Sequence, residues 1–407
     1  MKKTLLFLIA IGILSCLNAC GGGTSSSNGG GVVPSGPATY TFSVLHTFTG
    51  PPDGALPRSD LILDESGNLY GTTRNGGPSD FGTVFKLDTS GHVTILHSFA
   101  AGEGAAPFGG LVRDSAGNLY GTTFGGGDAG YGTVYKLDST GKLTVLHSFE
   151  TGPLDGGQPL AGLVMDAAGN LYGTASFGGA DGGGVVFKVD GAGEETVMHD
   201  FAEDPAGFFP SSSLILDAAG NLYGTNVYGG GALCECGAVF KVDPSGNDTK
   251  LYAFVGKASS DGPYGPDADT PLAGVVRDKA GTLYGTTVYG GSADMGTVYR
   301  VESDGTELAF HSFTGDDGEW PEGSLVLDAA GYLYGTTAVG GTAGGGGTVF
   351  VLDPAGKLTV LHSFNGQDGW NPLYAVVRDK AGNIYGTTTF GGSGNCGCGT
   401  VFKLTRQ

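Results

Sequence analysis

Basic side chains are scarce in this chain. Its 407 residues include 20 Lys and Arg against 40 Asp and Glu, which gives a formal net charge of −20 at pH 7. The long-range attraction that draws proteins to nucleic acid or to anionic lipid headgroups needs positive charge. We therefore predict no nucleic-acid partner and no membrane contact through surface charge.

Long hydrophobic runs are missing as well. The apolar stretch from Leu5 to Leu14 follows Lys2 and Lys3 and is much shorter than the roughly 20 residues that a helix needs to cross a bilayer. A short apolar run behind a basic start is typical of an export signal, which is removed before folding. The next residues, Leu17-Asn18-Ala19-Cys20, resemble the lipobox of bacterial lipoproteins, although Asn18 is unusual there.

The lipobox resemblance implies that residues 1–19 are a lipoprotein signal peptide and that Cys20 is acylated. The alternative is an ordinary signal peptide cut near Ala19. Gly21 follows the cysteine, and by the same resemblance this favours the outer membrane, on its periplasmic or cell-surface side. Residues 20–38 are rich in Gly, Ser and Thr, which is typical of a flexible tether. We predict a folded domain at 39–407 that touches the membrane through its lipid anchor only.

Motifs for nucleophilic, metal or phosphate chemistry are absent in any supporting context. The sequence has no Gly-x-Ser-x-Gly elbow, no His-Glu-x-x-His and no Walker or dinucleotide loop. Glycine runs such as Gly125–Gly127 open no helix, so they lack the helix N-terminus that holds a phosphate. We predict no cofactor and no metal.

Glycine and one repeated phrase are abundant. The chain has 80 Gly, yet 40% of its residues are hydrophobic and no Gly-X-Y period occurs, which excludes a collagen-like chain. The phrase Tyr-Gly-Thr recurs at spacings of 50, 52, 51, 61, 50 and 51 residues, so the chain holds seven units. Its tyrosines are Tyr70, Tyr120, Tyr172, Tyr223, Tyr284, Tyr334 and Tyr385.

Each unit predicts four short strands. In the second unit they are 110–114, 119–123, 132–137 and 143–149, all rich in β-branched and aromatic residues. Asp-x-x-Gly, as at Asp64 and Gly67, joins the first two strands, and we predict a tight turn there because a calcium loop needs more oxygen ligands. The glycine after each repeated tyrosine, such as Gly71, is expected to admit backbone or an aromatic ring from the next unit.

Seven units of four strands predict an all-β fold, a seven-bladed β-propeller. The last unit ends after its third strand at Leu404, and the missing fourth strand matches Tyr40–Phe48 at the start of the chain. We expect this N-terminal strand to complete the last blade and close the ring, which leaves no open sheet edge.

The phrases NLYGTT, GTVFKLD and TVLHSF recur in order in nearly every unit. They resemble the GloVer-type tandem repeat of secreted and surface-anchored bacterial proteins, and the resemblance extends from Tyr40 to Leu404. The resemblance implies the fold and the cellular address only, because this family carries no established activity.

Histidines and cysteines are the remaining candidates for chemistry. Six of the 7 histidines occupy one position of the outermost strand, where we expect inter-blade hydrogen bonds and no shared metal ion. Two Cys-x-Cys pairs lie between the second and third strands of units four and seven. We expect a disulfide within each pair, with free thiols as the alternative. These cysteines are Cys234, Cys236, Cys396 and Cys398.

Two sets of loops are long and variable, those from fourth to first strand and from second to third, and a propeller places both on one face. Aromatic rings beside carboxylates on a rigid scaffold are suited to a glycan. An alternative is that the rings only fill gaps above each blade. The candidate ligand-binding residues are Trp320, Trp370, Tyr264, Phe108, Phe208, Asp317 and Asp368.

The sequence therefore predicts a surface-anchored, non-catalytic propeller that binds a glycan or a cell-envelope protein. One alternative is a carbohydrate-active enzyme, a lyase or glycosidase, at the mouth of the central channel. That alternative needs non-repeated acids and bases in the channel, and no such pair stands out in the sequence. The other alternative is a structural envelope protein without a ligand.

Overall fold

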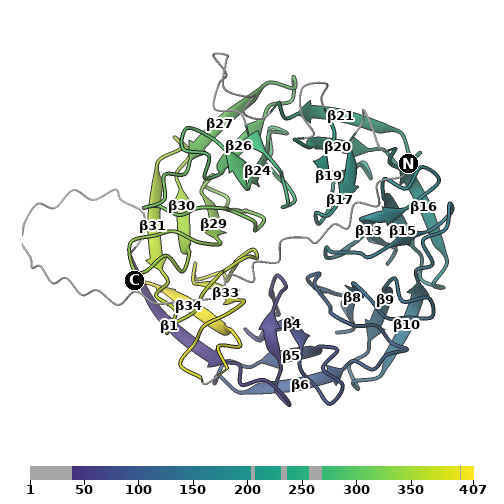
Figure 1. The fold of residues 1–407 in the computed structure, drawn as a ribbon, viewed down its shortest axis with the longest axis horizontal. Helices are drawn as coiled ribbons and strands as arrows, with labels where there is room; N and C mark the ends of the chain where they lie inside the picture. Colours follow the sequence, from purple (N-terminus) through teal and green to yellow (C-terminus); the bar gives the residue numbers. More distant parts are fainter. Residues whose placement is uncertain (1–38, 203–206, 231–235, 256–267, 395) are drawn as a thin grey trace, which may run out of the picture. The chain divides into compact units, whose positions relative to one another are not determined.

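The computed structural model describes residues 39–202, 207–230, 236–255, 268–394 and 396–407. No helix occurs among these residues. Seven four-stranded antiparallel sheets stand around one axis, each with its first strand innermost (Figure 1). The predicted seven-bladed β-propeller is confirmed.

The middle strands of the blades have the predicted positions, whereas each innermost strand is only two residues long. Blade 1 contains β3 (Ile62–Leu63), β4 (Leu69–Asn75), β5 (Thr83–Leu87) and β6 (Val93–Ser98). Blade 2 contains β7 (Val112–Arg113), β8 (Leu119–Thr123), β9 (Thr133–Leu137) and β10 (Leu143–Ser148). Blade 3 contains β12 (Val164–Met165), β13 (Leu171–Ala175), β15 (Val185–Val189) and β16 (Glu195–Asp200). Blade 4 contains β18 (Ile215–Leu216), β19 (Leu222–Tyr228), β20 (Ala238–Val242) and β21 (Asp248–Ala253).

The remaining blades repeat this pattern. Blade 5 contains β23 (Val276–Arg277), β24 (Leu283–Thr287), β26 (Thr297–Val301) and β27 (Glu307–Ser312). Blade 6 contains β28 (Val326–Leu327), β29 (Leu333–Thr337), β30 (Thr348–Leu352) and β31 (Leu358–Ser363). Blade 7 contains β32 (Val377–Arg378), β33 (Ile384–Thr388), β34 (Thr400–Arg406) and, on its outer edge, β1 (Tyr40–Thr47).

The two sets of variable loops are tied together on one side of the ring, which we call the loop face. In four blades short strands make this connection: β2 (Ala55–Pro57) with β4, β11 (Gly156–Gly157) with β14 (Phe177–Gly178), β17 (Phe208–Pro210) with β19, and β22 (Ala268–Asp269) with β25 (Tyr289–Gly290). In the other three blades single bridges replace them: Ala105 with Gly125, Glu319 with Val339, and Trp370 with Phe390.

The opposite face carries the Asp-x-x-Gly turns. In the first turn Asp64 Oδ1 accepts hydrogen bonds from the backbone N–H groups of Ser66 and Asn68, both at 2.9 Å, and Gly67 has a φ of 84°. The hydroxyl of Tyr70 donates to Asp64 Oδ2 at 3.0 Å. The equivalent Tyr–Asp bond occurs in all seven blades. The repeated tyrosine therefore holds the hairpin turn of its own blade.

The glycine after this tyrosine makes room for an aromatic ring, but the ring comes from its own blade. A Cβ on Gly71 would lie 2.8 Å from Phe85 Cζ and 2.7 Å from Leu61 Cδ2. Phe85 pairs with Gly71 across β4 and β5. The expectation of a ring from the next blade is wrong, because the side chain directly across the ladder already covers the glycine.

Neighbouring blades meet through pairs of buried aromatic rings. In every pair the phenylalanine that follows the outer strand of one blade packs edge-on against the third-strand aromatic residue of the next, with ring centroids 4.9 to 5.3 Å apart. Such pairs add about 0.5–1.5 kcal/mol beyond the burial of their surface. The pairs are Phe48–Phe85, Phe99–Tyr135, Phe149–Phe187, Phe201–Phe240, Phe254–Tyr299, Phe313–Phe350 and Phe364–Phe402.

A second seven-fold contact joins a glycine to the proline of the next blade. Gly399, at a φ of 95°, precedes the third strand of blade 7, and a Cβ there would lie 2.6 Å from Pro57 Cδ of blade 1. The residue before each of these prolines has a positive φ in all seven blades, for example Ala106 at 53° and Trp320 at 56°. The proline of blade 1 thus packs against blade 7 in the same way as the proline of every other blade packs against the blade before it.

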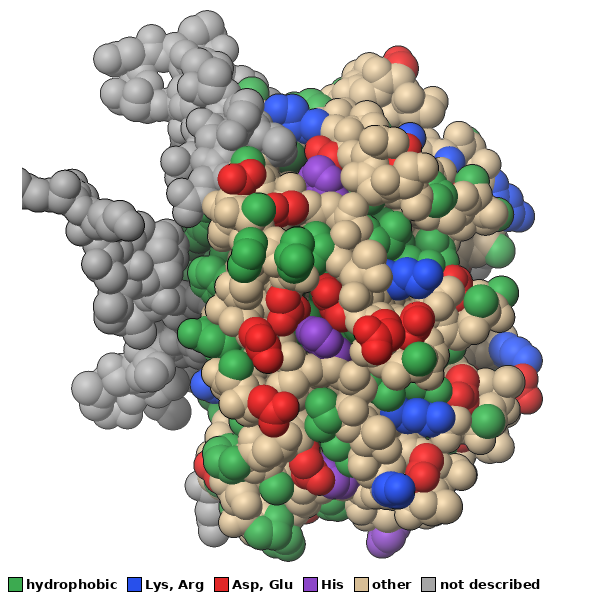
Figure 2. All heavy atoms as spheres, turned by 90° about the vertical axis from the view of Figure 1, so that its right-hand side faces the viewer, with side chains coloured by type: hydrophobic (Ala, Val, Ile, Leu, Met, Phe, Trp, Pro, Cys, Tyr) green, Lys and Arg blue, Asp and Glu red, His purple; other side chains and the backbone are tan. Residues whose placement is uncertain are grey.

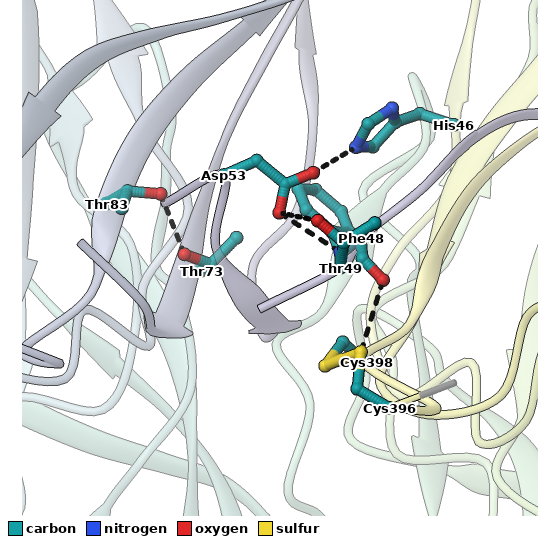
Figure 3. A network of polar contacts seen from close by, with 8 residues as sticks. All are labelled: His46, Phe48, Thr49, Asp53, Thr73, Thr83, Cys396 and Cys398. Atoms are coloured by element: carbon teal, nitrogen blue, oxygen red, sulfur yellow. Dashed lines mark hydrogen bonds and ion pairs between the residues drawn. A yellow bond between two sulfur atoms is a disulfide. The ribbon is translucent and has the colours of Figure 1, made fainter. Parts of the chain in front are cut away.

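The N-terminal strand closes the ring as predicted. β1 pairs with β34 from Tyr40–Arg406 to Thr47–Thr400, with a register shift between Val44 and His46. Directly after it, Phe48 enters the aromatic pair with Phe85 of blade 1. Figure 3 shows this corner, where His46 points to Asp53 in the loop that leads into blade 1.

Phe48→Ala tests the closure. Phe48 is fully buried, so removing its ring should lower the free energy of unfolding by about 3–5 kcal/mol. The measurement is urea-induced unfolding of the purified full-length chain. Val44→Ala is the control, because Val44 lies on β1, just before Phe48, and is 37% exposed. Equal losses in the two variants would contradict the closure.

Candidate functional site

The predicted aromatic candidates on the loop face differ in exposure. Trp320 is 38% exposed, and its ring centroid lies 6.4 Å from that of Tyr289 in blade 5. Trp370 is half-buried, and its backbone pairs with Phe390. Phe208 is also half-buried, with its ring 5.5 Å from Tyr228. Tyr264, a further candidate, lies outside the described residues.

Phe108 belongs to the channel wall. Its side chain is only 7% exposed and packs edge-on against Phe124. The guanidinium carbons of Arg58 and Arg74 lie 5.7 and 5.5 Å from the centre of its ring, so the ring stabilises two cations there. The ring of Phe108 therefore faces inward in this structure.

The two carboxylate candidates hold the loops that carry the tryptophans. Asp317 Oδ2 lies 2.9 Å from His311 Nε2, and Asp317 Oδ1 accepts a hydrogen bond from the backbone N–H of Thr314. Partial burial opposes ionisation, but these hydrogen bonds outweigh it and the pKa of Asp317 lies below its usual value. Asp368 makes the same contact with His362 at 3.0 Å.

These contacts explain the repeated histidine. Five of the six repeat histidines lie beside the acid in the loop that follows, at 2.9 to 3.1 Å, and we call each such pair a His–acid clip. His199 is the exception, since its Nδ1 lies 3.2 Å from the carbonyl oxygen of Gly246 in the next blade. The expected inter-blade bond is therefore correct for His199 only, and the other five partners are loop carboxylates.

Cys396 and Cys398 form a disulfide within the loop that precedes β34. Cys396 Sγ lies 3.4 Å from the carbonyl oxygen of Phe48, so this disulfide sits at the closing corner of the ring (Figure 3). Cys236 is 5% exposed. Cys234, Cys20 and residues 1–38 lie outside the described part of the chain.

The central channel holds a half-buried polar cluster that the sequence did not reveal. All seven blades line a cavity of about 60 Å³ with the residues that follow the repeated proline. Most of these residues are Gly, Ala, Ser or Leu, but Asp60, Glu322 and Tyr374 also line it. Arg58 follows the proline of blade 1 and is 7% exposed, with no hydrogen-bond partner for its Nε.

Burial sets the protonation of this cluster. It raises the pKa of Asp60 to about 6, although the backbone N–H of Ala375 donates to Asp60 Oδ1 at 2.8 Å. Burial also raises the pKa of Glu322 to about 7, against the opposing charge of Arg58. A carboxyl group with a pKa near neutrality can both accept and donate a proton under ordinary conditions. Burial raises the pKa of Tyr374 to about 12.

The non-repeated acids that the enzyme alternative needs are therefore present in the channel. Aligning the seven units at the proline would have found them, because only Asp60 and Glu322 are acidic among the three residues that follow it in each unit. The cavity is small, however. Substrate pockets measure roughly 300–1,000 Å³, so about 60 Å³ holds a few waters and no sugar ring.

A closed ring of seven blades, with aromatic loops on one face above a buried polar channel, defines a β-propeller with a candidate ligand-binding face. The chain belongs to the Gloeobacter/Verrucomicrobia repeat family, whose model matches residues 19–159, 151–268 and 263–407. This match confirms the GloVer-type resemblance. No curated protein matches the sequence.

Solved structures share the fold at low identity. The extracellular domain of a candidate one-component system from B. thetaiotaomicron is 14% identical with a TM-score of 0.53, and the match covers 91% of this chain but 42% of that one. A candidate 6-phosphogluconolactonase from Bacteroides uniformis is 18% identical with a TM-score of 0.51, over 78% of this chain and 88% of that one. At these identities the likeness shows the fold alone. Among the described residues, none forms a helix suited to crossing a bilayer.

Glu322→Gln tests the buried channel acid. Folding raises the pKa of Glu322 from 4.5 to about 7, so its contribution to stability is present below the unfolded value and is lost as the pH rises through about 7. The shift corresponds to about 3 kcal/mol. The free energy of unfolding of the unaltered chain should therefore decrease between about pH 5 and about pH 8 as Glu322 ionises. In Glu322→Gln this decrease should be smaller by about 2–3 kcal/mol.

The measurement is urea unfolding at both pH values. Glu65→Gln is the control, because Glu65 is exposed in a hairpin turn. If all three proteins show the same pH dependence, Glu322 is not a buried acid with a raised pKa.

Proposed function

We propose that the protein is an exported, lipid-anchored propeller that binds a glycan, without altering it, through its loop face. One observation carries the proposal: all four exposed aromatic side chains of the described residues belong to loops of this face. They are Tyr131, Phe177, Tyr289 and Trp320, which are 38 to 43% exposed. Removing the apolar surface of exposed rings from water is favourable, so a ligand that covers them gains binding free energy.

Three of these rings belong to two groups that bridge neighbouring blades. Tyr289 and Trp320 meet edge-on between blades 5 and 6. Phe177 meets Phe209 with centroids 5.2 Å apart between blades 3 and 4, and Phe209 also lies 5.8 Å from Tyr228. Flat rings of this kind cover the apolar face of a sugar at a low cost in conformational entropy.

Polar groups beside the rings supply partners for hydroxyl groups. Asp316 is exposed and Glu319 is half-exposed in the same loop as Trp320. This loop is fixed by the His311–Asp317 clip and by the bridge between Glu319 and Val339. A platform fixed before the ligand arrives binds with less loss of entropy than a mobile loop.

The proposed export and lipid anchoring are supported mainly by the sequence. The apolar run at residues 5–14, Cys20 and the Gly/Ser-rich segment support export and lipid anchoring. The neighbour from B. thetaiotaomicron is itself an extracellular domain, which is in keeping with export. The acidic chain and an acyl anchor together fit a protein held at the membrane by lipid alone.

The combined substitution Trp320→Ala and Tyr289→Asn tests glycan binding. Both residues are natural at these positions in other blades, as Ala106 and Asn75, and Ala106 has a φ of 53°, so the variant should fold. We expect its binding on a glycan and cell-wall polymer array to fall by about 10-fold or more, with little change in melting temperature. Leu308→Ala, at a 45% exposed rim residue, is the control and should bind normally.

A large loss of stability in the double variant would instead favour rings that fill gaps in the loop face. If the unaltered chain binds cell-envelope proteins but no glycan, a protein ligand is favoured. If it binds neither, a structural role is favoured.

The polar cluster in the channel supports a second candidate, a lyase or glycosidase that acts at the channel mouth. Its carboxyl groups, Asp60 and Glu322, have pKa values raised to about 6 and 7, as a catalytic acid or base requires. Incubation with the polymers that the array identifies should then release reducing or unsaturated ends. Glu322→Gln should abolish this release, whereas Glu65→Gln should not. If no polymer is shortened by the unaltered chain, the enzyme candidate is wrong.

A further inference from the structure

The rim between blades 2 and 3 combines an acidic residue at one repeat position with a neighbouring His–acid clip. The position is that of Val93 in β6, which pairs with Leu87, and of its equivalents in the other outer strands. In blade 7 it is Phe42, whose ring stacks on His362 with centroids 3.6 Å apart. Blades 1, 2 and 6 have Val93, Leu143 and Leu358 there, whereas blades 3, 4 and 5 have the acids Glu195, Asp248 and Glu307. Of these acids only Glu195 adjoins a His–acid clip, because the blades before the other two carry His199, which lies against the carbonyl of Gly246, and Tyr252. Figure 2 faces this rim around β16 and shows carboxylates beside histidines.

Three metal-ligating side chains meet at this place. His147 of blade 2, Asp155 of the following loop and Glu195 of β16 each offer one ligand atom, and the three atoms lie within 4.8 Å of one another. His147 Nε2 lies 3.0 Å from Asp155 Oδ1. The backbone N–H groups of Glu150 and Gly156 donate to the Asp155 carboxylate at 2.6 and 2.7 Å and fix its orientation. Among the described residues this is the one such group.

The third side chain has no protein partner at one of its oxygens. Glu195 Oε1 is buried and makes no hydrogen bond. Burial, and then the negative charge of Asp155, raise the pKa of Glu195 to about 7, against the effect of His147. Two carboxylates thus converge in a half-buried place, and none of the Lys or Arg residues that the structure describes makes an ion pair with either of them. A bound cation would remove both the repulsion and the orphaned oxygen.

We propose that His147, Asp155 and Glu195 bind one divalent transition-metal ion, with Zn²⁺ as the expected occupant. One imidazole and two carboxylates form a three-ligand set that suits Zn²⁺ and leaves a position for water. Ca²⁺ and Mg²⁺ are disfavoured, since they require six or more oxygen ligands. The metal would displace the hydrogen bond between His147 and Asp155 and join blade 2 to blade 3.

Zn²⁺ titration of the metal-stripped full-length chain tests this site by calorimetry and by melting temperature. Co²⁺ absorbance reports the coordination directly. We expect one ion per chain and a higher melting temperature with metal. Glu195→Leu should weaken binding by about 100-fold or more, and it should fold normally because Leu143 and Leu358 occupy the same repeat position.

Two further variants make the test specific. Glu307→Leu removes the corresponding acid of blade 5 and should leave Zn²⁺ binding unchanged, because Tyr252 replaces the repeat histidine in the preceding blade 4. Leu358→Glu places a carboxylate at the position of blade 6 that adjoins the His311–Asp317 clip and should raise the stoichiometry to two ions. The proposal fails if millimolar Zn²⁺ does not bind, if Glu195→Leu binds as well as the unaltered chain, or if Glu307→Leu loses binding too.

Discussion

The edge-to-face contact between buried aromatic rings of adjacent blades is the interaction on which this structure depends. A four-stranded blade of some 50 residues has an apolar surface on both sides and no core of its own. Each blade therefore becomes stable only when its neighbours cover it. Seven such contacts need a closed ring, because an open row would leave one apolar face at each end. The pairing of β1 with β34 supplies that closure and puts Phe48 in place against Phe85.

Most of the repeated residues make contacts that stabilise the ring. The tyrosine and aspartate of each hairpin bond to each other, the glycine after the tyrosine accommodates a ring of its own blade, and the proline packs on a glycine of the blade before. The His–acid clips fix the loops of five blades. Function must therefore come from residues that break the repeat. The exposed rings, the channel acids and Glu195 are all departures of this kind.

These departures lie at three different places, and each has a different physical character. The loop face offers exposed aromatic surface that is suited to a broad ligand such as a glycan. The channel holds buried acids whose pKa values are raised by loss of water, but its volume of about 60 Å³ limits what can enter. The rim between blades 2 and 3 brings two carboxylates and an imidazole together. Binding on the loop face, proton transfer in the channel and metal binding on the rim can therefore be tested independently.

The number of blades, the positions of their middle strands, the turn type and the displaced closing strand all follow from the sequence. These features are local or periodic, and a period of about 50 residues with a missing last strand admits one closed arrangement. Only the tertiary structure decided which side chains converge. Asp60 and Glu322 are 262 residues apart and line one cavity because the first and sixth units share one axis. Likewise, Glu195 reaches His147 only because adjacent outer strands lie side by side. Convergence across blades depends on the curvature of the ring, which no local pattern of residues encodes.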